Sequence, residues 1–140
     1  MLTEKECQLL AKQMRGTMVE AMGVRFVPSD DEVARCEMPI TPTVRQYFGV
    51  LHGGASLALA ETIAGVGSLH LLGFDPAMKI CGTHVEGVHL AMSPTEGKVL
   101  GEATLLHAGR STHVWNVDIR DEQGTLLSTE RVTNRVLRDK

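Results

Sequence analysis

Cysteine is scarce in this chain, and no cluster of basic residues stands out. The three cysteines, Cys7, Cys36 and Cys81, are far apart and form no CxxC pair, so neither a disulfide framework nor a zinc knuckle is indicated. The formal net charge is -3, and the lysines and arginines are scattered. A nucleic-acid-binding protein needs a positive patch to attract phosphates. We therefore expect no nucleic-acid partner and, because the thiols look reduced, a cytoplasmic location.

Recognisable targeting segments are also lacking. The opening residues, MLTEKECQLL, contain no basic region followed by an apolar core and a small-residue cleavage site, which disfavours secretion. The longest apolar run approaches the length of a membrane span, but Glu61, His70 and several glycines inside it make insertion costly. We expect no membrane partner.

The composition is that of one ordinary globular domain. The chain has 140 residues, of which 43% are hydrophobic and 22% are charged. Such a chain can bury a core without support from a metal or a disulfide. No internal repeat or linker is visible, so a single domain is expected over residues 1–140.

Periodic apolar residues predict the secondary structure. Thr3 and Glu6 have the spacing of a capping box, which predicts a short helix in an N-terminal helical segment, residues 1–22. Residues 52–72 are apolar or small on every side, as in a buried central helix that ends at Gly73. Alternating segments separated by turn residues predict strands, and these lie at 24–26, 33–40, 79–90, 98–107, 111–121 and 125–137.

These elements together favour an α+β fold. An antiparallel sheet of five to six strands wrapped around one long central helix, with a short N-terminal helix added, would bury both the sheet's apolar face and the helix. One curled sheet cannot cover a helix on every side. The apolar surface left over predicts a homo-oligomer.

Glu61 is the most informative residue of the chain. It is the only formally charged side chain between Arg45 and Asp75, and it lies in the middle of the most apolar helix. Burying an unpaired carboxylate is costly, so we expect Glu61 to have a raised pKa, a polar partner or a solvated pocket at an interface. Such carboxylates are candidates for catalysis, although a Glu on a solvent-facing side of the helix would look the same in the sequence.

The second candidate element is the glycine pair at the start of the same helix. Gly53 and Gly54 would let a ligand approach free N–H groups at the positive end of the helix dipole, as in an oxyanion hole; a plain glycine-rich turn is the alternative. Gly53 and Glu61 are eight residues apart, which is about 12 Å along a helix. We therefore expect Glu61 to act on a carbonyl bound at Gly53 of a neighbouring subunit.

Two sequence motifs resemble those of a known family. The segment QYFGVLHGGA, residues 46–55, and the segment LAET, residues 59–62, resemble the signature of hotdog-fold thioesterases of the 4-hydroxybenzoyl-CoA type with a glutamate catalyst, a branch that includes the phenylacetate-pathway enzymes. The similarity extends from about Gly23 to Leu137 and includes GRST at residues 109–112. It implies hydrolysis of an aromatic or medium-chain acyl-CoA, or acyl-carrier-protein thioester, to the free acid and the thiol.

The resemblance also implies a role for individual residues. Glu61 would attack the thioester carbonyl or activate water, and the Gly53 N–H would polarise that carbonyl. Gln46 would lie near the thioester, and His52 would orient the acyl group. The residues implied to bind the CoA part of the substrate are Gly82, His89, Gly109, Arg110, Ser111 and Thr112. No other cofactor is expected, and the protein would form a homodimer or a tetramer built as a dimer of dimers.

Two positions depart from the family pattern. Many relatives carry a Ser or Thr one helical turn after the glutamate, where its hydroxyl could hold the hydrolytic water, but this chain has Gly65 there. Thr62 and Ser68 are the candidates to replace that hydroxyl. Ala91 stands where related enzymes have an arginine that helps to bind a CoA phosphate.

Other functions are weaker alternatives. A hotdog-fold enoyl-thioester hydratase or dehydratase would need a paired His and acid, and Glu61 has no clear His partner in the sequence. A non-catalytic acyl-CoA-binding protein would suit the missing hydroxyl at Gly65. No metal site is expected, because His84 and His89 should lie on opposite faces of a strand. There is also no GxSxG motif for a serine hydrolase.

Overall fold

The computed structural model describes residues 1–139, and Lys140, the last residue of the expected domain, lies outside the described residues. The described part contains three α-helices, one short 3-10 helix and six strands. The helices are α1 (Glu4–Gln13), α2 (Met18–Ala21) and α3 (Gly53–Leu71), with the 3-10 helix η1 at Pro42–Val44. The strands are β1 (Arg25–Val27), β2 (Ala34–Pro39), β3 (Met78–His89), β4 (Lys98–Ala108), β5 (Thr112–Asp121) and β6 (Leu126–Arg138).

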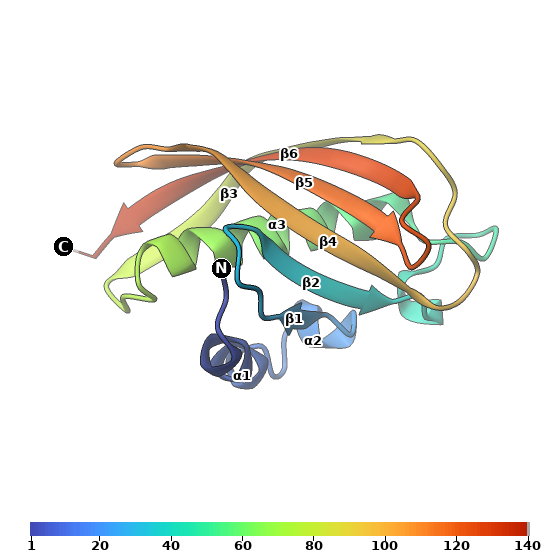
Figure 1. The fold of residues 1–140 in the computed structure, drawn as a ribbon, viewed down its shortest axis with the longest axis horizontal. Coiled ribbons are helices and arrows are strands. Elements are labelled where there is room, and N and C mark those ends of the chain that lie inside the picture. The colour runs from blue at the N-terminus through green and yellow to red at the C-terminus, as the bar shows by residue number, and fades with distance from the viewer. Residues whose placement is uncertain (140) are drawn as a thin grey trace.

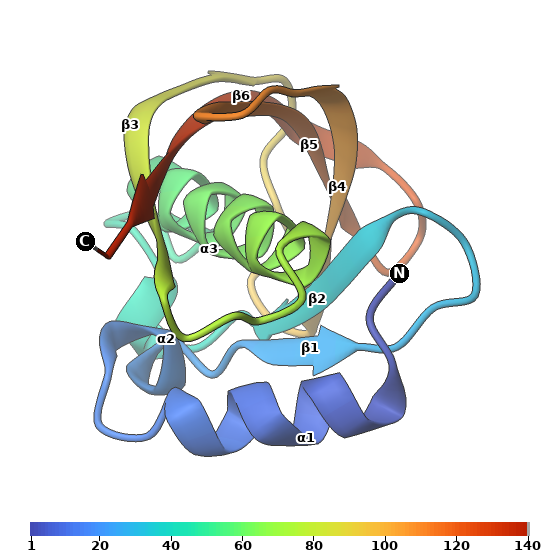
Figure 2. The same cartoon turned by 90° about the vertical axis from the view of Figure 1, so that its left-hand side faces the viewer.

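The six strands form one antiparallel sheet that curls around α3. Their order is β1-β2-β4-β5-β6-β3. Seen down the helix, the sheet passes from β3 over α3 to β2 and then to β1 beneath it (Figures 1 and 2). The predicted architecture is therefore confirmed. The sheet does not close, because β3 pairs only with β6 and β1 only with β2, so one side of α3 is left without a strand.

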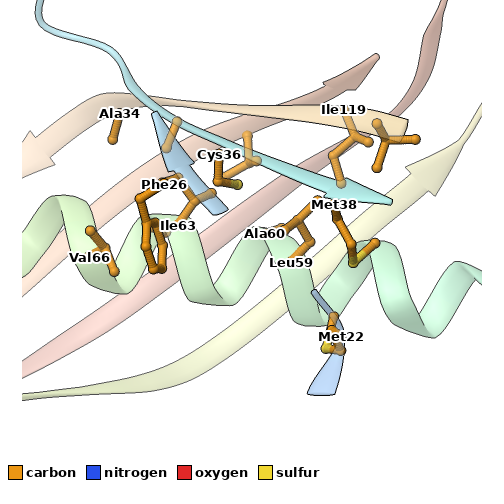
Figure 3. Packing of buried hydrophobic residues seen from close by; sticks show 14 of the residues in the cluster. Met22, Phe26, Ala34, Cys36, Met38, Leu59, Ala60, Ile63, Val66 and Ile119 are labelled. Carbon is orange, nitrogen blue, oxygen red and sulfur yellow. The ribbon is translucent and has the colours of Figure 1, made fainter. Parts of the chain in front are cut away.

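The core lies between α3 and the concave face of the sheet. Leu59, Ala60 and Ile63 of α3 are buried against Cys36 and other side chains of the sheet (Figure 3). Along β5 every second residue is buried, as the alternation in the sequence predicts. Trp115, on that inward face, is fully buried. No helix among residues 1–139 is long and apolar enough to cross a membrane.

The N-terminal segment differs from the predicted single helix. The capping box is present, since the Glu6 N–H donates to Thr3 Oγ1 and the Thr3 N–H donates to the Glu6 carboxylate. However, the helical pattern does not continue to Met18, because Gly16 adopts a φ of 75° and breaks the helix. Thr17 then caps the separate helix α2. Helix α1 packs on β1, outside the curled sheet (Figure 2).

The inward face of β6 is unusually polar. Ser128, Glu130 and Asn134 point toward α3 and are at most 2% exposed. The carboxylate oxygens of Glu130 have no hydrogen-bond partner among residues 1–139. Glu130 lies close to Gly87 of β3, where an added Cβ would be 2.8 Å from Glu130 Cγ. Burial raises the pKa of Glu130 from 4.5 to about 7, and the negative charge of Asp118 adds to the effect.

The close packing of α3 on the sheet can be tested at two glycines of the same helix. A Cβ on Gly67 would lie 2.6 Å from the Trp115 ring, whereas a Cβ on Gly65 would have no neighbour among residues 1–139 within 4 Å. We expect Gly67→Ala to destabilise the protein by roughly 1–3 kcal/mol through overpacking. Gly65→Ala should be neutral or stabilising by up to about 1 kcal/mol, because alanine is the better helix former. Urea unfolding at one protein concentration measures the stability of both variants. Equal stabilities of the two variants would contradict the packing described.

The buried Glu130 should make stability depend on pH. Its pKa is raised in the folded protein, so between pH 4.5 and 7 the unfolded chain releases a proton that the folded chain keeps. The contribution of Glu130 to the free energy of unfolding is therefore fully present below pH 4.5. It is lost as the pH rises through 7, and the loss is on the order of 3 kcal/mol. Glu130→Gln removes this loss. In urea unfolding at pH 4.5, 6 and 8, its advantage over the wild type should grow with pH, whereas the exposed control Glu96→Gln should show no such growth. A constant difference for Glu130→Gln would refute the assignment.

Candidate functional site

The N-terminus of α3 is built by the residues that the motif contains. His52 is the N-cap, and its Nδ1 accepts a hydrogen bond from the Gly54 N–H at 2.8 Å. Gly53 is the first helical residue, and none of the hydrogen bonds among residues 1–139 uses its N–H. A helix leaves its first N–H groups free, at the positive end of the dipole. The Gly53 N–H is therefore available to an electron-rich ligand atom.

A pocket of about 360 Å³ opens at this helix end. Three of the predicted site residues line it, namely Gln46, Gly53 and His89. His89 approaches Gly53 so closely that a Cβ on the glycine would lie 2.8 Å from His89 Nε2. His52 does not line this pocket in the single chain; it is exposed and caps the helix. The remaining lining residues are Val50, Leu51, Ser56, Leu90, Ala91, Met92, Ser93, Leu127 and Ser128.

Glu61 lies in a second pocket, of about 250 Å³, together with Gly82. The carboxylate rests on the edge strand β3, because a Cβ on Gly82 would overlap Glu61 Oε1. Of the alternatives expected for Glu61, the single chain shows a pocket open to solvent, where the residue is exposed. The physical reason is that Glu61 lies on the side of α3 that its own sheet leaves open. Among residues 1–139, no hydrogen bond or ion pair involves its carboxylate.

The two pockets are associated with opposite ends of β3. His89, beside Gly53, pairs with Ser128, whereas Gly82, beside Glu61, pairs with Asn134. The turn Gly109-Arg110-Ser111-Thr112 lies at the Glu61 end, where the Val136 N–H donates to the Ser111 carbonyl. The structure thus brings Gly53, Gln46 and His89 together, and separately brings Glu61 and Gly82 together. It does not join the two groups within one chain.

Large apolar side chains are exposed around the Gly53 pocket. Tyr47 and Phe48, in the segment before α3, are 94% and 72% exposed. At the end of β3 and just beyond it, Val88, Leu90 and Met92 are also more than half exposed. Soluble single chains rarely leave so much apolar surface in one region, and such a surface marks a site of association. These five residues lie outside α3, so this surface is not the leftover helix surface that the sequence predicts.

Two of the hydroxyl groups near Glu61 are already engaged. The Thr62 hydroxyl donates to the Ala58 carbonyl at 2.7 Å. Ser68 Oγ accepts hydrogen bonds from Trp115 Nε1 and Asn134 Nδ2 and lies 2.9 Å from His113 Nδ1. Burial, together with the nearby His107, lowers the pKa of His113.

Asn134 was missed in the sequence analysis, although it lines the Glu61 pocket. The signal was available in the alternation of β6, where the even-numbered residues from 128 to 136 are the buried ones. Ser128 lines the other pocket and belongs to the same alternating set. Polar residues on a face that should be apolar mark a site rather than a plain core.

The sequence matches the family model described as thioesterase superfamily over residues 48–128. The 1,4-dihydroxy-2-naphthoyl-CoA hydrolase of Escherichia coli is 36% identical over 122 residues, which cover 87% of this chain and 88% of that protein. The proofreading thioesterase EntH of Cronobacter sakazakii is 35% identical over 122 residues, with 87% of each chain covered.

Solved structures agree with these sequence matches. A thioesterase from Haemophilus influenzae superposes with a TM-score of 0.88 at 30% identity, covering 99% of this chain and 92% of that one. A mutant thioesterase from Pseudomonas aeruginosa gives a TM-score of 0.89 at 30% identity, covering 97% and 96%. With its motifs, its curled sheet and these relatives, the chain belongs to the thioesterase superfamily and is a thioester hydrolase of the hotdog fold.

Proposed function

We propose that this enzyme hydrolyses an aromatic or medium-chain acyl-CoA to the free acid and CoA, at a site that two subunits share. The observation that carries the proposal is the separation of Gly53 and Glu61 into two pockets of one chain. Eight helical residues place their backbones about 12 Å apart along α3. A carbonyl held by the Gly53 N–H would therefore be out of reach of the same chain's Glu61, but not of a neighbour's.

In this proposal the thioester carbonyl oxygen accepts a hydrogen bond from the Gly53 N–H. The helix dipole and this donor stabilise the negative charge that develops on the oxygen, a contribution of roughly 3 kcal/mol for one preorganised donor. The carboxylate of the neighbouring Glu61 either attacks the carbonyl carbon to form an anhydride, which water then hydrolyses, or takes a proton from an attacking water. In both routes the carbon–sulfur bond breaks, and the thiolate leaves and takes up a proton.

The proposal also assigns roles to the other predicted site residues. Gln46 lines the Gly53 pocket and would lie near the thioester, although its Oε1 also accepts from the Phe48 N–H. His52, exposed at the cap, would reach the acyl group only when a second subunit covers it. The CoA part would be bound by Gly82, His89 and the turn from Gly109 to Thr112, which is exposed at Arg110 and Ser111.

Several features support assembly as a homodimer or as a dimer of dimers. The apolar side chains beside the Gly53 pocket need a cover, and β3 has an unpaired edge beside them. A two-fold axis would bring each subunit's Gly53 pocket to the partner's Glu61. The names of the relatives, a 1,4-dihydroxy-2-naphthoyl-CoA hydrolase among them, support an aromatic acyl group. The free thiols of all three cysteines suit the cytoplasm.

Replacement of Glu61 tests the catalytic assignment. Glu61→Gln should lower thiol release from a panel of aromatic and medium-chain acyl-CoAs by a factor of about 10³ or more, because neither a nucleophile nor a base remains. The oligomer should stay intact by size-exclusion chromatography. The control Glu86→Gln changes an exposed carboxylate beside His84 on β3, the edge strand that the Glu61 carboxylate contacts. This variant should keep wild-type turnover. Full activity of Glu61→Gln would remove Glu61 from the mechanism.

Complementation tests whether the site is shared. Gly53→Ala, whose Cβ would press on His89, and Glu61→Gln should each be inactive alone. When the two variants are co-expressed with different tags, the whole population should recover up to about a quarter of wild-type activity, because about half of the dimers are mixed and each mixed dimer has one intact site of two. Co-expression of Glu61→Gln with Glu61→Ala should recover none. Mixed dimers that form but remain inactive would place the whole site within one subunit.

A further inference from the structure

The pocket that holds Glu61 is apolar except for a few groups. Five of its ten lining residues have large apolar side chains, namely Met14, Val19, Val66, Leu69 and Ile80. Asn134 of β6 also lines it, and this side chain is fully buried. Asn134 Oδ1 has no hydrogen-bond partner among residues 1–139. A buried polar atom without a partner in a native protein calls for a physical explanation.

The hydrogen bonds around Ser68 leave Asn134 Oδ1 without a partner among residues 1–139. The Ser68 hydroxyl accepts from Trp115 and from Asn134 Nδ2, so its own proton goes to His113 Nδ1. A hydroxyl has one proton and two lone pairs, and all are then used. In this arrangement the nitrogen of the Asn134 amide faces Ser68. The oxygen is then the amide atom left without a partner.

Space for a small ligand lies beside Glu61. Gly65 follows Glu61 by one helical turn, on the same face of α3, and a Cβ there would meet no atom of residues 1–139 within 4 Å. Gly65 and Asn134 line the same pocket as Glu61. Asn134 also pairs with Gly82, the residue on which the Glu61 carboxylate rests. The Glu61 carboxylate, the Asn134 side chain and the open space at Gly65 therefore belong to one pocket.

We propose that Asn134 Oδ1 and the Glu61 carboxylate together hold the hydrolytic water in the space that Gly65 leaves open. The Ser68 hydroxyl cannot do this, because it is fully engaged, and the proton of the Thr62 hydroxyl already goes to the Ala58 carbonyl. The water donates one hydrogen bond to each of the two acceptors, and a lone pair on its oxygen points at the carbonyl carbon. When the oxygen–carbon bond forms, Glu61 takes one proton and the carbon–sulfur bond breaks. The departing thiolate then receives the proton from Glu61.

This inference rests on the proposed hydrolysis at Glu61, and it assigns Asn134 to the water rather than to CoA. The step applies to the route in which Glu61 acts as a base on water, because a Glu61 carboxylate bound in an anhydride could not accept the water's proton. Loss of one of the two acceptors leaves the water misaligned. Misplacement of a reacting atom by about 1 Å can lower a rate by 10²-fold.

The test compares the nearly isosteric variants Asn134→Val and Asn134→Thr, which differ by a hydroxyl. Asn134→Val should lower kcat roughly 10- to 100-fold with little change in KM, because ground-state binding of the acyl-CoA is untouched. Asn134→Thr should keep more of the activity, since its hydroxyl can still bond to water. Circular dichroism and size-exclusion chromatography confirm the fold first, and Asn134→Ala replaces Asn134→Val if the latter does not fold.

Rescue at a second position separates this role from a structural one. Gly65→Ser places a hydroxyl in the open space and should restore most of the kcat that Asn134→Val loses, although it cannot restore the bond to Ser68. Wild-type kcat in Asn134→Val, or no recovery in the double variant, would overturn the assignment. A wild-type enzyme that releases no thiol from any acyl-CoA would instead refute the proposed function itself.

Discussion

The packing of α3 into the curved sheet is the constraint on which the rest of this structure depends. Buried side chains of the helix fill the concave face, and the backbones approach most closely where glycines allow it. Gly67 accepts the Trp115 ring, Gly82 accepts the Glu61 carboxylate, and Gly53 accepts His89. Two of these three contacts belong to the candidate site. The same packing that stabilises the fold therefore sets the positions of the reacting groups.

The sheet is wide enough to enclose the helix only in part, and this has a chemical consequence. On the open side, Glu61 remains exposed in the single chain. At the N-terminus of the same helix, the free Gly53 N–H is set to stabilise negative charge. Because the Glu61 carboxylate and the Gly53 N–H belong to the same helix, that helix keeps them apart. The open side is also where a second subunit can supply the missing half.

The polar inward face of β6 contributes residues to both pockets of the site. Ser128 contributes to the pocket at Gly53, Asn134 contributes to the pocket at Glu61, and Glu130 lies between them in sequence. Each has at least one side-chain atom without a partner among residues 1–139. Apolar residues on this face would pack as well or better against the helix. The sheet therefore gives up some stability along one strand, in the region where the substrate would bind.

Periodicity and turn residues in the sequence determined the elements, the antiparallel sheet and the central helix, because these depend on contacts within a few residues. The motif QYFGVLHGGA and Glu61 likewise identified the family from local signals. Tertiary structure alone decided that Glu61 is exposed and touches Gly82, and that Asn134, 73 residues further along the chain, lines its pocket. It also decided that the hydroxyls of Thr62 and Ser68 are engaged. Such contacts depend on strand register and on the helix rotation that packing selects, and neither is encoded in a short stretch of residues.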